Sequence, residues 1–201
     1  MPVAAGRAGL RIDRLEESLA ILRGLLGGKR VRHQGAWYHI DGLELDVMPE
    51  HHGRPPVLIG AGGPRMLRLA ARHADIVGLL PAPIKASEDR DDPHDRLPPA
   101  FDSKLAALRS AAGDRFSQLE LSAFAAFTIT TRRRASTEDL IAQRGWDGID
   151  VETVWQMPTI YIGSPAQIRA DLQARRDRFG LSYLVTSDRD LPTLSTVIAA
   201  L

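Results

Sequence analysis

The stretch PPVLIGAGGPR, residues 55–65, decides the fold, because it combines a buried strand, a glycine turn and the start of a helix. Residues 57–59 form a short apolar run after two prolines, which is typical of a strand buried on both faces in a parallel sheet. The glycines that follow allow tight or left-handed backbone and leave no Cβ in the way of a ligand. Pro64 suits the first helical turn, where its missing N–H costs nothing.

The residues after this stretch complete a βαβ unit. Residues 65–73 predict a helix, and the apolar run at 75–80 predicts a second buried strand. The glycine turn then lies at the carboxyl end of the first strand. Free N–H groups at the start of the helix would make this turn an anion site. The alternative is a tight turn whose glycines serve geometry alone.

The spacing of the glycines is only a weak match to a dinucleotide fingerprint. That fingerprint requires a third glycine where Arg65 stands, and an acidic residue about 20 positions on. No second βαβ repeat with such an acid follows. A nucleotide-binding Rossmann domain is therefore a further alternative, which the imperfect fingerprint and the hairpin before the turn argue against.

Composition excludes several classes of protein. The chain has 201 residues, 44% of them hydrophobic and 25% charged, which predicts one globular α/β domain over residues 1–201. A net charge of +1 predicts neither nucleic acid nor anionic membrane as a partner. The absence of cysteine excludes disulfides, thiolate catalysis and zinc–thiolate sites. No transmembrane run or secretory h-region is evident in the sequence, so we expect a cytoplasmic protein.

Periodicity predicts alternating helices and strands along the rest of the chain. Helices are expected at 10–26, 101–115, 165–179 and 192–201, and strands at 119–130 and 181–186. A small β-hairpin is expected at 31–40. Two capping boxes are expected to open helices, at residues 136–139 and 164–167. Alternation of this kind indicates an α/β fold.

Three polar groups allow a structural and a functional interpretation. His33 and His39 could meet across the hairpin as metal ligands, but no third ligand is evident. The long loop 81–99, which holds the mixed charge run 88–92, is interpreted as solvated or as a lid, and the run lacks the spacing of a calcium loop. The run 132–134 is interpreted as a solvated arginine turn, with an electrostatic site as the alternative. We therefore predict no metal site.

Several stretches together resemble the luciferase-like monooxygenase family, in particular its branch that uses the deazaflavin coenzyme F420. Their order and spacing extend over nearly the whole chain, although no one of them is decisive. They are residues 11–17 with the hairpin segment 35–38, residues 55–65 with 69–75, residues 162–168, and residues 175–183.

The resemblance implies a (β/α)8 TIM barrel with a small β-hairpin insertion. Such barrels need about 250 residues. This chain offers four barrel strands, near 57–61, 76–80, 121–130 and 182–186, so the resemblance implies an N-terminally truncated barrel, roughly its C-terminal half. Half a barrel has two open sheet edges, which predicts a homo-oligomer or a partner that completes the barrel.

The resemblance also implies a function. The cofactor, F420 or alternatively FMN, would carry the hydride or oxygen chemistry on a small organic substrate. Its phosphate would lie on the glycine turn, with the binding residues Gly60, Ala61, Gly62, Gly63, Pro64 and Arg65. Catalytic residues are unknown, and strand ends nominate Leu79, Leu80, Pro81, Thr130, Thr186, Ser187 and Asp188. The alternative is a catalytically inactive barrel fragment that serves as a binding or assembly subunit.

Overall fold

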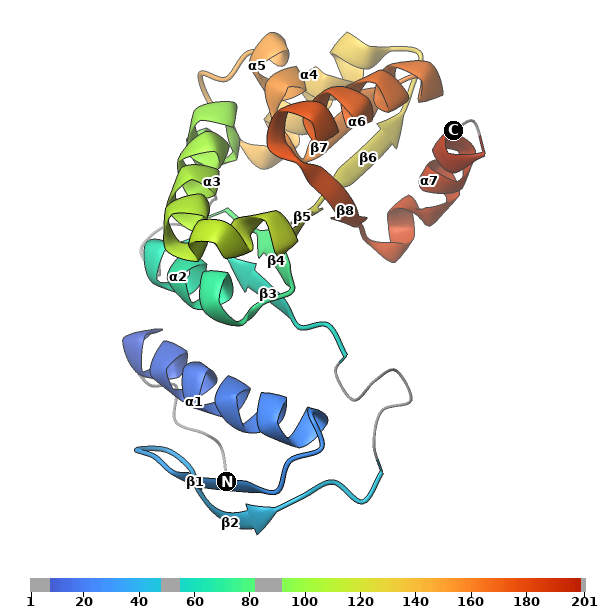
Figure 1. The fold of residues 1–201 in the computed structure, drawn as a ribbon. Coiled ribbons are helices and arrows are strands. Elements are labelled where there is room, and N and C mark those ends of the chain that lie inside the picture. Colours follow the sequence, from blue (N-terminus) through green and yellow to red (C-terminus); the bar gives the residue numbers. More distant parts are fainter. Residues whose placement is uncertain (1–7, 48–54, 82–91, 200–201) are drawn as a thin grey trace. The chain divides into compact units, whose positions relative to one another are not determined.

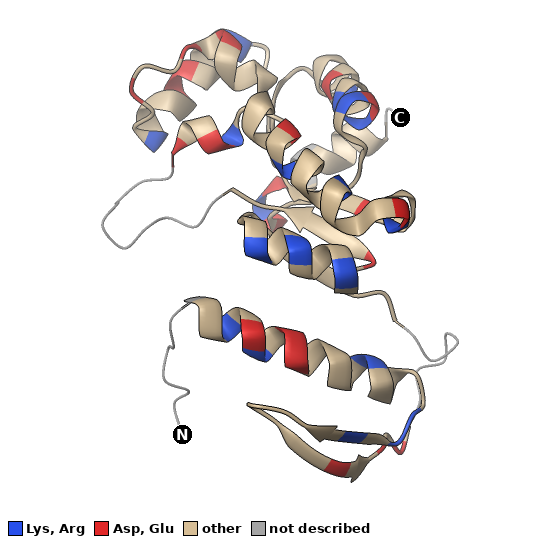
Figure 2. Ribbon diagram, turned by 60° about the vertical axis from the view of Figure 1, so that its left-hand side comes forward, with Lys and Arg blue, Asp and Glu red and all other residues tan. Residues whose placement is uncertain are grey.

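The computed structural model describes residues 8–47, 55–81 and 92–199. The chain divides into two compact units, residues 1–57 and 58–201, and each is considered by itself (Figure 1). Figure 2 shows both acidic and basic residues in each unit, in keeping with the small net charge. The interpretation of residues 1–201 as a single domain stays a prediction.

The first unit is a helix followed by the predicted hairpin. Its elements are α1 (Ala8–Leu26), β1 (Val31–Gln34) and the antiparallel β2 (His39–Leu43). The carboxylate of Glu17 on α1 accepts the N–H groups of Trp37 and Tyr38 and contacts the ring of His33 at 2.6 Å. His33 therefore has a carboxylate partner, and the described part of the chain holds no cluster of three metal-ligating side chains.

The second unit is built on a four-stranded parallel sheet. The strands lie in the order β3-β4-β5-β8, which is also their order along the chain. They are β3 (Leu58–Ala61), β4 (Ile76–Leu79), β5 (Glu120–Phe124) and β8 (Leu181–Val185). A Rossmann sheet reverses its strand order at a switch point, and this sheet does not. In a (β/α)8 barrel, neighbouring strands also follow one another along the chain, so the strand order of this sheet matches that of a barrel.

Helices cover one face of this sheet. Helix α2 packs on β3 and α3, and α6 packs on β8. Phe101 and Phe179 meet edge to face at 5.4 Å and join α3 to α6. Ile59, Val77 and Leu121 are buried on the covered side. These helices are α2 (Pro64–His73), α3 (Pro98–Ala112) and α6 (Pro165–Phe179), whereas α7 (Leu191–Ile198) packs on α6 and on β6.

The predicted strand at 119–130 is in fact two strands. The N–H of Ala125 donates to the carbonyl of Val185 at 2.8 Å, and the next N–H, that of Ala126, donates to Thr159 at 2.9 Å. Successive N–H groups of a strand point to opposite sides, so the neighbouring strand changes here. As a result β6 (Ala126–Ile129) pairs in parallel with β7 (Ile160–Gly163), a strand that the sequence pattern did not predict.

The capping box predicted at 136–139 is wrong. Helix α4 (Arg133–Arg144) begins three residues earlier, and the Ser136 hydroxyl, inside it, donates to Thr130 Oγ1 at 3.0 Å. Arg132 is the N-cap of α4, and Arg133 and Arg134 stand in its first turn, so the arginine run opens a helix. Helix α5 (Val151–Gln156) begins after Asp150, whose carboxylate accepts the Thr153 N–H at 2.7 Å.

The four barrel strands do not close into a barrel. β3 and β8 are the two edges of the sheet. The acidic loop, apart from Asp92, lies outside the described residues, so the predicted lid and carboxylate site are not tested. Within the part of the chain that the structure describes, no helix is long and apolar enough to span a membrane.

Candidate functional site

The glycine turn joins β3 to α2 and brings three backbone segments together. A Cβ on Gly62 would lie 2.7 Å from the carbonyl oxygens of both Leu80 and Pro81. Because those atoms are backbone and cannot swing away, position 62 requires glycine. Of the two expectations, tight or left-handed backbone, the left-handed one is wrong, since Gly60, Gly62 and Gly63 are not among the residues with positive φ. Close approach is the reason for glycine at position 62.

Gly63 is the N-cap of α2 and leaves this end of the helix accessible. Its φ and ψ are −95° and 160°, and no side chain caps the helix. The Leu67 N–H donates to the Gly63 carbonyl at 3.0 Å, which is the first bond of the helix. A Cβ at Gly63 would meet no atom within 4 Å. Among the described residues, a side chain or a ligand atom could therefore stand at the N-cap of α2, where the helix dipole favours an anion.

A pocket of about 350 Å³ adjoins the turn, between α2 and α3. A partly buried ion pair lines it, in which the Lys104 ammonium lies 2.7 Å from the Asp95 carboxylate and donates to the Asp95 carbonyl at 3.2 Å. The lining residues are Gly62, Pro64, Leu67, Asp95, Ala100, Ser103, Lys104 and Ala107.

Sequence reasoning missed Lys104, although a signal was present. It lies three residues after Phe101 and four before Leu108, on the buried stripe of α3. A lysine on an apolar stripe is buried only when it has a partner.

The nominated strand-end residues fall into two groups. Leu80 and Pro81 pack their carbonyl groups against Gly62, so the structure brings them to the turn. Thr130 instead accepts the Arg132 N–H at 3.0 Å, and the Thr186 hydroxyl donates to Asp190 at 2.8 Å. These two threonines make local contacts that organise the following helices.

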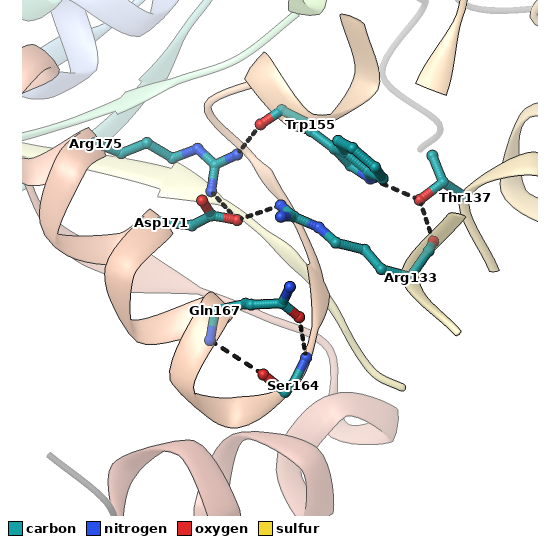
Figure 3. Close-up of polar contacts among 7 residues, drawn as sticks. All are labelled: Arg133, Thr137, Trp155, Ser164, Gln167, Asp171 and Arg175. Carbon is teal, nitrogen blue, oxygen red and sulfur yellow. Dashed lines mark hydrogen bonds and ion pairs between the residues drawn. The ribbon is translucent and has the colours of Figure 1, made fainter. Parts of the chain in front are cut away.

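A second polar cluster joins α4, α5 and α6 (Figure 3). The Asp171 carboxylate accepts from Arg133 at 2.8 Å and lies 3.7 Å from Arg175. Arg175 donates to the carbonyl of Trp155 at 2.8 Å, and its guanidinium lies 4.3 Å from the ring centre of Tyr161. Burial raises the pKa of Tyr161 to about 12 and lowers the pKa of Arg175. The cluster fixes the position of α6.

The capping box predicted at the start of α6 is confirmed (Figure 3). The Gln167 N–H donates to the Ser164 hydroxyl at 3.3 Å, and the Ser164 N–H donates to the Gln167 side chain at 2.9 Å. Pro165 occupies the first helical turn, and Gly180 ends the helix in the left-handed conformation, with φ 71°.

Comparison with known proteins agrees with this fold. The model of the luciferase-like monooxygenase family matches residues 4–182, and the chain belongs to this family. F420-dependent glucose-6-phosphate dehydrogenase 1 of Rhodococcus jostii is 31% identical over 193 residues, which cover 87% of this chain and 54% of that protein. The 5,10-methylenetetrahydromethanopterin reductase of Archaeoglobus fulgidus is 39% identical over 80 residues, covering 40% of this chain and 22% of that protein.

Solved structures show the same fold at low sequence identity. An F420-dependent secondary alcohol dehydrogenase superposes with a TM-score of 0.60 at 15% identity, covering 92% of this chain and 59% of that one. EDTA monooxygenase from Chelativorans sp. BNC1 superposes with a TM-score of 0.63 at 15% identity, covering 90% of this chain and 55% of that one. The chain thus spans little more than half the length of these relatives.

Proposed function

We propose that this chain belongs to an oxidoreductase that uses F420, or alternatively FMN, and acts on a small organic substrate by hydride transfer or monooxygenation. The turn of residues 60–65 would hold the cofactor phosphate. The supporting observation is the uncapped start of α2, where Gly63 leaves open space. The name of the R. jostii relative also supports F420 as the cofactor, because that enzyme is called F420-dependent.

The residues of the turn fit a phosphate in three respects. The N-terminal N–H groups of α2 would donate hydrogen bonds to its oxygens. Gly62 and Gly63 let the backbone approach without side chains in the way. Arg65 stands in the first turn of α2, where its charge would favour a phosphate over a neutral group. Lys104 is already paired with Asp95, so we assign no phosphate charge to it.

The cofactor, when bound, would supply the hydride or oxygen chemistry. The task of this chain is then to bind and orient the cofactor. Anchoring its phosphate at the carboxyl end of β3 would place the rest of the molecule at the strand ends, where TIM-barrel enzymes act. We assign no residue of this chain to proton transfer.

The test is a fluorescence titration of F420 into the wild-type chain and into Gly63→Asp. Aspartate suits the N-cap conformation of residue 63, so this variant should fold normally. Its carboxylate would occupy the first N–H groups of α2 and repel an anion. We expect at least a tenfold loss of affinity.

The matched control places an aspartate at the N-cap of another helix. Arg132 is the exposed N-cap of α4 and makes no side-chain cap bond. Arg132→Asp should bind F420 as the wild type does. Equal affinity in Gly63→Asp and the wild type would contradict the assignment of the turn.

A second candidate function is a catalytically inactive barrel fragment that acts as a binding or assembly subunit. The observation that favours it is the four-stranded sheet, which does not close into a barrel among the described residues. Cofactor binding without any turnover of glucose 6-phosphate or secondary alcohols would favour this candidate over the enzyme.

A further inference from the structure

The pocket between α2 and α3 owes its space to small side chains on α3. Ala100, Ser103 and Ala107 are three and four residues apart, so they share one face of this helix, and all three line the pocket. Pro64 and Leu67 line it from α2. Its volume of about 350 Å³ is at the lower end of the range for ligand pockets, which suits a short group and not a whole cofactor.

The pocket adjoins the glycine turn directly. Gly62 of the turn and Pro64, the first residue of α2, both line it. Between them stands Gly63, where a Cβ would meet no atom within 4 Å. A phosphate held by the first N–H groups of α2 would therefore have the pocket beside it.

A buried ammonium group faces this pocket. Lys104 is 7% exposed and donates to the carboxylate of Asp95 at 2.7 Å and to the carbonyl of the same residue at 3.2 Å. Asp95 belongs to the short helix η1 (Pro93–Arg96). An ammonium group has three N–H donors, and the described residues provide acceptors for two of them. The third N–H is available to a ligand.

The charges that line the pocket cancel. The Asp95 carboxylate neutralises Lys104, so a further carboxylate placed here would be repelled by Asp95. The Ser103 hydroxyl already donates to the carbonyl of Pro99 at 2.8 Å. The remaining side chains that line the pocket are apolar, namely Pro64, Leu67, Ala100 and Ala107. The pocket therefore suits a short apolar group that carries one uncharged hydrogen-bond acceptor.

We propose that this pocket receives the second ester arm of a phosphodiester whose phosphate lies on the glycine turn. A monoester such as FMN ends at its phosphate and would leave the pocket unused. F420 is a phosphodiester, and the arm beyond its phosphate begins with a lactyl group. The methyl group of this arm matches the apolar walls, and its carbonyl oxygen would accept the third N–H of Lys104. The inference rests on the proposed function and selects F420 over FMN.

The test compares three ligands that share one ring system. They are F420, the 5′-phosphate monoester of its deazariboflavin core, and the core without phosphate, each titrated into the wild-type chain and followed by fluorescence at fixed ionic strength. The second arm adds one hydrogen bond and buries a few apolar atoms. We therefore expect F420 to bind about tenfold more tightly than the monoester.

A pocket-filling variant separates the arm from the phosphate. Ala107→Leu would fill the pocket from α3 without touching the turn, and leucine is a good helix former, so the variant should fold. We expect it to bind F420 and the monoester equally, with the wild-type affinity for the monoester. The matched control is Ala106→Leu, at an exposed position of α3 that does not line the pocket. This control should keep the preference for F420.

A double variant tests the part that Lys104 plays. Lys104→Met combined with Asp95→Asn removes both charges together, so no buried charge is left without a partner. The apolar walls remain, whereas the N–H donor to the arm is lost. The preference for F420 over the monoester should fall to about threefold.

Two results would overturn the inference while leaving the phosphate site intact. One is equal binding of F420 and the monoester by the wild type, with both tighter than the core. The other is a preference for F420 that persists in Ala107→Leu, because the arm would then lie outside the pocket. If the monoester binds no more tightly than the core, the phosphate site is wrong and this inference is wrong with it.

Discussion

At the scale of single residues, the two glycines of the turn have different physical roles. A Cβ on Gly62 would overlap the carbonyl oxygens of Leu80 and Pro81, whereas one on Gly63 would meet open space. We expect Gly62→Ala to lower the free energy of unfolding by about 1–3 kcal/mol, the usual cost of overpacking. Gly63→Ala should cost less, under about 1 kcal/mol, which is the preference for glycine over alanine at an N-cap. Urea denaturation of both variants measures this difference, and equal stabilities would contradict the close approach at Gly62.

Tyr161 makes stability depend on pH in the alkaline range. Burial raises its pKa from the ordinary value of 10 to about 12, so the folded chain keeps a proton that the unfolded chain releases. The contribution is complete below pH 10 and is lost as the pH rises towards 12. The free energy of unfolding should fall by roughly 2–3 kcal/mol over this range.

The control for this pH dependence is Tyr161→Phe, which lacks the ionising hydroxyl. The difference in unfolding free energy between the wild type and this variant should change between pH 10 and pH 12. Denaturation curves at pH 9, 10, 11 and 12 measure it. If the difference in unfolding free energy between the two proteins stays constant from pH 9 to pH 12, burial does not raise the pKa of Tyr161, and the prediction is wrong.

At the scale of elements, the cluster around Asp171 holds α4 and α6 together. Its carboxylate is shared by Arg133 and Arg175, so Asp171→Asn would leave two guanidinium groups without their anion. We expect a loss of about 1–3 kcal/mol in unfolding free energy. Asp177→Asn on the same helix should cost less than about 0.5 kcal/mol, because Asp177 is exposed and accepts an exposed hydrogen bond from Gln173. Equal losses of unfolding free energy in Asp171→Asn and Asp177→Asn would contradict the role of Asp171 in holding α4 and α6 together.

Elements whose boundaries have local chemical signals could be predicted from the sequence. The four-stranded sheet, the hairpin and α6 were predicted, and α6 has Ser164, Pro165 and Gln167 at its start. α4 was misplaced because a capping pattern at 136–139 occurs inside a helix that begins at Arg133. β7 was missed because only four residues form it and its one partner, β6, is distant in sequence.

The candidate site could be predicted only in part. The glycine turn is local, so its position followed from the sequence. The reason why position 62 requires glycine could not be predicted, because the contacts with Leu80 and Pro81 arise only when β4 lies beside β3. The Lys104–Asp95 pair joins α3 to a separate short helix, η1 (Pro93–Arg96), and periodicity does not reveal such contacts.

At the scale of the whole molecule, the chain is an α/β member of the luciferase-like monooxygenase family and spans about half the length of its relatives. Among the described residues, its four-stranded parallel sheet has β3 and β8 at its edges, and α2 and α6 pack on these two strands.

The most direct test of the central claim compares cofactors with and without their phosphate. The wild-type chain is titrated with F420 and its phosphate-free deazariboflavin core, and with FMN and riboflavin, at fixed ionic strength. A charge-assisted phosphate contact is worth about 1.5–3 kcal/mol, so the phosphate-bearing member of the preferred pair should bind at least tenfold more tightly. Equal affinity within both pairs, or no binding of any of the four, would contradict the account.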